Sequence, residues 1–80
     1  MQEPNEIERE IIVRNALAVI VDNREEKSLN YAVNYAKAGM DMAGEELKVQ
    51  CLYVLNNMSR WRGEQGKYVR KVLKDFTSVK

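Results

Sequence analysis

The stretch EQGKYVRKVLKDF, residues 64–76, has the clearest helical pattern in the sequence. Its apolar side chains recur at i, i+3, i+4 and i+7, and basic side chains occupy most of the positions between them. The apolar positions are Val69, Val72, Leu73 and Phe76. This spacing is typical of an amphipathic helix with one apolar and one basic face. The stretch therefore predicts a final helix over 64–76 that packs its apolar face against a core.

Three further helices are expected before this one. They cover about residues 5–21, a segment that begins between 23 and 29 and ends near 38, and about 42–60. Asp22 and Glu25 have the spacing of a capping box, which predicts an early start for the second helix, and Ser28 is a competing cap for a later start. Gly39 is expected to end that helix in the left-handed conformation, and Gly63 is expected to separate the last two helices. Four helices with short connections predict an all-α, antiparallel bundle that forms a single domain over 1–80.

The expected third helix is apolar on two sides. One stripe contains Leu47, Cys51, Val54, Leu55 and Met58, and a second contains Val49, Leu52 and Tyr53. A helix with two apolar sides is expected at the centre of a bundle, with neighbours covering both. The run Val19–Val21 is β-branched and therefore compatible with a strand, but no partner strand is visible in the sequence.

The groups that most enzymes use for catalysis are absent from the sequence. It contains no histidine and one cysteine, Cys51. Without histidine the commonest general base is missing, and one thiol supports neither a thiolate zinc site nor an internal disulfide. We expect Cys51 to pack in the core, and Glu45 and Glu46 to stabilise a helix N-terminus. The sequence predicts no enzyme activity, no metal and no cofactor.

The charges are unevenly distributed along the chain. Residues 1–26 contain seven acids and three arginines, a net charge of −4, whereas residues 60–80 contain seven bases and two acids, a net charge of +5. Two interpretations fit this asymmetry: the basic end contacts nucleic acid, or the two ends attract each other. The longest apolar stretch, residues 16–21, is much shorter than the roughly 20 residues of a membrane span, and no secretory signal is expected. A single thiol suits a reducing compartment, so we expect a cytoplasmic location.

Residues 47–76 also have part of the spacing of a helix-turn-helix. The motif needs a small residue, a turn glycine four positions later, and apolar residues six and nine after the glycine. Ser59, Gly63, Val69 and Val72 satisfy these positions. The basic side chains of the last helix would then face phosphates. These candidate nucleic-acid-binding residues are Lys67, Arg70, Lys71 and Lys74. The simpler interpretation is a solvated basic face, which any amphipathic helix after a glycine produces.

Trp61 lies between Arg60 and Arg62, and these three residues are the candidate partner-binding residues. Trp61 is either an aromatic anchor at an interface or a residue that closes the core with the arginine stems alongside. The tyrosines at 31, 35, 53 and 68 have the same two interpretations, and helical spacing favours half-buried packing for most of them.

Three segments stand out in the last two-thirds of the chain: Leu47–Asn57, Trp61–Gly63 and Val69–Leu73. In these segments the chain resembles small uncharacterised helical proteins of phage, prophage and archaeal genomes. The resemblance implies no activity and no site residues.

The expected function is a non-enzymatic helical interaction module that acts through protein–protein contacts. Because one chain is not expected to cover all its apolar surface, self-association as a dimer is included. The alternative is a small DNA-binding or accessory protein that uses the helix-turn-helix-like pair. No membrane contact or small-molecule substrate is expected.

Overall fold

The computed structural model describes residues 5–29 and 31–77. Over these residues the chain forms four α-helices and one short 3₁₀ turn, with no strand. The helices are α1 (Glu6–Asp22), α2 (Ala32–Gly39), α3 (Gly44–Asn56) and α4 (Glu64–Thr77), and the 3₁₀ turn η1 (Lys27–Leu29) lies between α1 and α2. The predicted all-α fold is confirmed, and the β-branched run Val19–Val21 belongs to α1.

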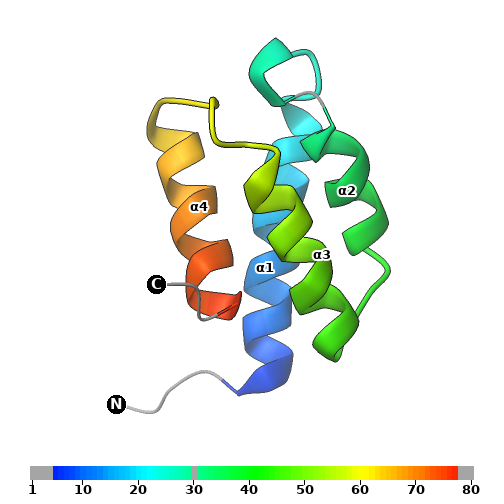
Figure 1. The fold of residues 1–80 in the computed structure, drawn as a ribbon. Coiled ribbons are helices and arrows are strands. Elements are labelled where there is room, and N and C mark those ends of the chain that lie inside the picture. Colours follow the sequence, from blue (N-terminus) through cyan, green and yellow to red (C-terminus); the bar gives the residue numbers. More distant parts are fainter. Residues whose placement is uncertain (1–4, 30, 78–80) are drawn as a thin grey trace.

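The helices form an antiparallel bundle in which the chain runs up and down in turn (Figure 1). Helix α1 packs against α2 and α4, and α3 packs against the same two neighbours from the other side. The core between them contains one apolar face of each helix. Its fully buried side chains include Leu17 and Ile20 of α1, Leu47 and Val54 of α3, and Leu73 of α4. Each helix therefore has an inner face that is covered and an outer face that is open.

Helix α1 begins where the sequence predicts. The side chain of Asn5 accepts a hydrogen bond from the backbone N–H of Glu8 at 2.8 Å, which satisfies one free donor of the first turn. Glu6 and Glu8 add negative charge near the positive end of the helix dipole. At the other end, Asp22 is the last residue of α1 and Asn23 its C-cap. The predicted capping box at Asp22 is therefore wrong, because the first helix continues through this residue.

Helix α2 is shorter than expected, and it ends differently. Gly39 is the last residue of α2 and does not have a positive φ, so the predicted left-handed role is wrong. A Cβ at this position would lie 2.9 Å from Cδ1 of Leu17. Gly39 therefore allows close approach of α2 to α1. The glycines with positive φ are Gly44 at 59° and Gly63 at 100°, the first at the start of α3 and the second just before α4.

The connection between α3 and α4 is longer than the sequence suggests, because α3 ends at Asn56 rather than near residue 60. Arg70 of α4 stabilises this connection. Its Nη1 donates to the backbone carbonyl oxygen of Trp61 at 2.6 Å and to that of Met58 at 3.4 Å. At Gly66 an added Cβ would lie 2.7 Å from the same oxygen of Trp61, so the first turn of α4 lies directly against the connection.

Candidate functional site

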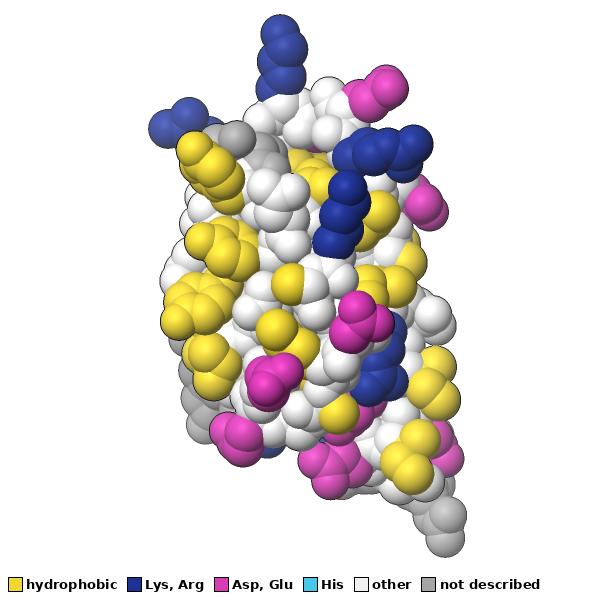
Figure 2. All heavy atoms as spheres, turned by 90° about the vertical axis from the view of Figure 1, so that its right-hand side faces the viewer, with side chains coloured by type: hydrophobic (Ala, Val, Ile, Leu, Met, Phe, Trp, Pro, Cys, Tyr) yellow, Lys and Arg dark blue, Asp and Glu magenta, His cyan; other side chains and the backbone are white. Residues whose placement is uncertain are grey.

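Five exposed apolar side chains lie on the outer sides of the packed pair α2 and α3. We name this surface the tyrosine face, and it consists of Tyr31, Tyr35, Val49, Leu52 and Tyr53. Their side chains are between 37% and 61% exposed, with Tyr31 the most accessible. Figure 2 shows apolar side chains in a column along the left edge of this side of the molecule. Such clustering distinguishes the face from scattered exposed apolar residues, which are ordinary on protein surfaces.

Backbone and side-chain contacts hold the tyrosine face in place. The rings of Tyr35 and Tyr53 stack with centroids 5.6 Å apart and an interplanar angle of 29°, which joins α2 to α3 at the surface. Beneath them, Nε2 of the buried Gln50 donates to the backbone carbonyl oxygen of Tyr35 at 2.9 Å. Val49 precedes Tyr53 by one helical turn and therefore lies on the same side of α3. The face is thus preorganised on two helices.

The centre of the tyrosine face carries no charge, and its two ends carry opposite charges. Ala38 and Asn56, exposed one turn away on the same helices, are uncharged. The side chain of Lys48, one turn before Leu52, is 42% exposed, and its Nζ lies over the Phe76 ring of α4, 5.9 Å from the ring centroid. Glu45 and Glu46 lie in the first turn of α3, at one end. Lys27 and Arg60 line a polar hollow with Asn56 at the other end. In Figure 2 the column of apolar side chains lies between basic groups above and acidic groups below.

The sequence pattern predicted the second apolar stripe of α3 but not its exposure. Most of the first stripe is buried as expected, since Leu47, Cys51, Val54 and Met58 are 0% exposed, whereas its fifth member, Leu55, is only partly buried. The prediction that neighbours cover both stripes is wrong. Helices α2 and α4 flank only the inner side of α3, so Val49, Leu52 and Tyr53 face outward. The pattern gives the direction of these side chains, whereas their exposure depends on the position of α3 in the bundle.

The four basic residues predicted for nucleic-acid binding have two different environments. Lys67, Lys71 and Lys74 are exposed on the outer side of α4. Arg70 is partly buried, and its guanidinium donates to two carbonyl groups of the preceding connection. It is therefore occupied in holding the fold and does not extend to a phosphate.

The predicted helix-turn-helix geometry is not found in residues 47–76. The motif requires Ser59 in its first helix, but α3 ends at Asn56, so Ser59 lies in the connection. That connection spans 57–63, whereas the motif has a turn of about three to four residues and strongly crossed helices. Helices α3 and α4 instead run antiparallel beside each other (Figure 1).

The side chains of Trp61 and its two neighbours lie in different environments. Trp61 is 5% exposed and belongs to the core cluster, so its ring does not present an anchor at the surface. Arg60 and Arg62 are exposed. Of the three candidate partner-binding residues, only the arginines are accessible, and Arg60 lies at the basic end of the tyrosine face.

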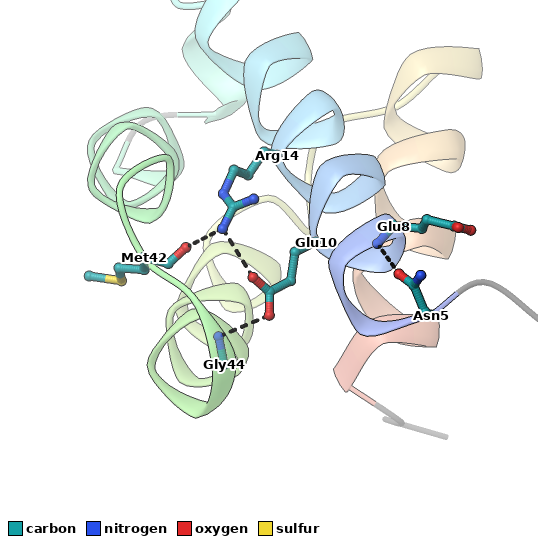
Figure 3. A network of polar contacts seen from close by, with 6 residues as sticks. All are labelled: Asn5, Glu8, Glu10, Arg14, Met42 and Gly44. Carbon is teal, nitrogen blue, oxygen red and sulfur yellow. Dashed lines mark hydrogen bonds and ion pairs between the residues drawn. The ribbon is translucent and has the colours of Figure 1, made fainter.

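A polar network between α1 and the connection from α2 to α3 is structural (Figure 3). Glu10 and Arg14 of α1 form an ion pair at 3.0 Å and point toward the connection between α2 and α3. Arg14 also donates to the carbonyl oxygen of Met42 at 2.9 Å, and Glu10 accepts from the backbone N–H of Gly44 at 3.1 Å. Ala43, the N-cap residue of α3, provides no side-chain cap. Glu10 therefore caps α3 from another helix.

Cys51 is fully buried, as predicted, and desolvation raises the pKa of its thiol to about 12. A thiol with this pKa is protonated at neutral pH and is a poor nucleophile. Within the described parts of the chain, no group of three or more acidic or cysteine side chains is arranged to hold a metal ion. A groove between α1 and α4 is lined by Ile12, Val72 and Phe76, with Arg9 and Asp75 also lining it.

No family model, curated protein or solved structure matches this chain. The resemblance to phage, prophage and archaeal proteins therefore stays a prediction. None of the helices in residues 5–29 and 31–77 has the length and apolar character needed to cross a membrane.

Proposed function

We propose that this protein is a non-enzymatic helical interaction module that acts through protein–protein contacts on its tyrosine face. The observation that carries the proposal is an exposed, uncharged face with three tyrosines on two rigidly paired helices. Interface centres are enriched in aromatic residues and depleted of charge, and tyrosine is among the residues that dominate binding energies.

The stacking of Tyr35 on Tyr53 supports this function because it limits the conformations of both rings before a partner binds. Side chains that are already ordered lose less conformational entropy on association. The tyrosine hydroxyl groups also tolerate water in the free protein, so a tyrosine-rich face is compatible with both the free and the bound state.

Site-specific photo-cross-linking of the full chain in its native cells tests the proposal. A benzophenone amino acid replaces Leu52 on the tyrosine face in one variant and Lys71 on α4 in another. We expect irradiation to attach protein, identified by mass spectrometry, at position 52 and not at position 71. Val49→Glu, which places a charge at the centre of the face, is expected to abolish the adduct because a buried, unpaired carboxylate is costly.

Lys71→Glu is the matched control, since it introduces the same side chain at an exposed position outside the face. It is expected to leave the adduct at position 52 unchanged. Equal adduct formation at both positions, or an adduct at 52 that survives Val49→Glu, would contradict the proposal.

A second candidate function is DNA contact through α4, and the exposed lysines Lys67, Lys71 and Lys74 favour it. With three phosphate contacts, the logarithm of the association constant for duplex DNA would fall linearly with the logarithm of the salt concentration, with a slope of roughly −3. Fluorescence anisotropy with a labelled duplex measures this slope. The triple alanine variant should bring it close to zero, and absence of binding at low salt would exclude the candidate.

A further inference from the structure

The distribution of charge around the tyrosine face identifies the partner that fits it. We propose that a second copy of this chain binds there, in a two-fold arrangement that brings α2 and α3 of each copy together with α3 antiparallel to its counterpart. This inference rests on the proposed function, because it assigns the occupant of the same face.

The uncharged centre allows two copies to approach each other. In a two-fold interface each residue near the axis meets its own equivalent, so any charge at the centre would meet a like charge. The central residues Val49, Leu52 and Tyr53 carry none. The contact instead brings apolar and aromatic surface together, which is favourable for both copies.

The charged ends favour one orientation of the second copy. Glu45 and Glu46 lie in the first turn of α3, whereas Lys27 and Arg60 lie together beside its last residue, Asn56. An axis perpendicular to α3 places the acidic end of each copy over the basic end of the other, at both ends of the interface. An axis parallel to α3 would place acid over acid and base over base, which is unfavourable.

These end charges are accessible for a partner. Glu45 forms an ion pair with Lys48 at 3.8 Å, but its side chain remains 87% exposed. Glu46, Lys27 and Arg60 are also exposed. Near Lys27, the carboxylate of Glu26 accepts from the Ser28 hydroxyl at 3.1 Å, and Glu26 and Lys27 both line a hollow beside α2. Lys27 also lines the hollow at Asn56 together with Arg60, whereas Glu26 does not, so Lys27 and Arg60 are the charges at this end of α3.

A dimer of standard size would use a minor share of the molecular surface. A standard interface takes about 800 Å² from each partner. The whole chain exposes 5679 Å².

Charge reversal of each end, followed by mixing, tests the arrangement. The first variant carries Glu45→Lys and Glu46→Lys, and the second carries Lys27→Glu and Arg60→Glu. Sedimentation equilibrium of the wild-type full chain, up to millimolar concentration, is expected to show a monomer–dimer equilibrium. Each variant alone should dimerise at least about tenfold more weakly, because both ends of its interface then carry like charges.

An equimolar mixture of the two variants is the decisive measurement. In the antiparallel arrangement every end of the mixed dimer pairs opposite charges, so the mixture should recover a dissociation constant within about threefold of the wild type. A wild-type chain that stays monomeric, or a mixture that does not recover, would overturn the inference.

Two further measurements keep the test independent of folding defects. Glu45→Lys and Glu46→Lys place positive charge at the N-terminus of α3, so circular dichroism must show wild-type helix content before they are used. Val49→Glu disrupts the centre without touching either end and should abolish the dimer, whereas Lys71→Glu should not. If the purified chain is monomeric while photo-cross-linking attaches another protein at position 52, the dimer fails and the proposed function stands.

Discussion

At the scale of single residues, Arg70 shows how a surface pattern can conceal a structural contact. Its guanidinium donates to the carbonyl oxygen of Trp61 and to that of Met58, which also accepts from the backbone N–H of Trp61 at 3.0 Å. Hydrogen bonds to a charged group contribute about 1.5–3 kcal/mol each to stability. Arg70→Ala is therefore expected to lower the free energy of unfolding by about 2 kcal/mol, as measured by chemical denaturation.

Lys71→Ala is the matched control, since Lys71 is exposed on the same helix. Its effect should stay within about 0.5 kcal/mol. If Arg70→Ala lowered the free energy of unfolding no more than Lys71→Ala, the guanidinium would not be holding the connection. Arg70 would then be a candidate phosphate contact together with the exposed lysines of α4.

Cys51 gives the second prediction at this scale. Burial raises the pKa of its thiol from an ordinary value of 9.0 to about 12. Between these values the unfolded chain loses the thiol proton and the folded chain keeps it, so folding stability is complete below pH 9 and falls as the pH rises toward 12. The expected slope is about 1.4 kcal/mol per pH unit.

The free energy of unfolding is measured for the wild type and for Cys51→Ala from about pH 8 to about pH 11, at intervals of about half a pH unit. This range covers most of the window that the two pKa values define. Other groups titrate in both proteins, so the difference between the two curves isolates the thiol. Parallel curves would show that the thiol ionises equally in both states.

At the scale of helices, Gly66 fixes how closely α4 approaches the connection that precedes it. An added Cβ would lie 2.7 Å from the backbone oxygen of Trp61, which cannot move without shifting the chain. Although a helical Gly→Ala change normally stabilises by about 1 kcal/mol, Gly66→Ala is expected to destabilise by more than about 1 kcal/mol.

Gly39→Ala is a useful comparison, measured by the same denaturation experiment. Its closest contact would be a methyl group of Leu17, the end of a side chain that can rotate. We therefore expect Gly39→Ala to cost less than Gly66→Ala. The reverse order would mean that the connection at Trp61 moves more easily than the core around Leu17.

The helices also show what sequence patterns can predict. The bounds of α1 and α4 were predicted to within one residue at each end, because Asn5 and the 3.6-residue periodicity are local signals. The end of α3 and the start of α2 were not, because distant contacts define them. Arg70 holds the connection after α3, and Leu29, in the separate turn η1, is buried in the core.

At the scale of the whole molecule, the candidate site depends on packing that no single helix encodes. The periodicity of α3 predicted Val49, Leu52 and Tyr53 as a second apolar stripe, but not that four helices in one layer around the core leave it open. For Trp61 the sequence allowed an interface anchor or a residue that closes the core, and its burial shows that it closes the core. Side-chain direction is local information, while exposure depends on which neighbours the bundle provides.

The last prediction concerns the stability of the molecule as an assembly. If the tyrosine face binds a second copy, unfolding also separates the copies, so the melting temperature must rise with protein concentration. For a domain of this size we expect an increase of about 2–4 °C for each tenfold rise in concentration within the range where dimers form. Val49→Glu should have a melting temperature that does not depend on concentration, and Lys71→Glu should behave as the wild type does. Scanning calorimetry across that range measures all three, and a wild-type melting temperature that stays constant would show that the chain unfolds as a monomer.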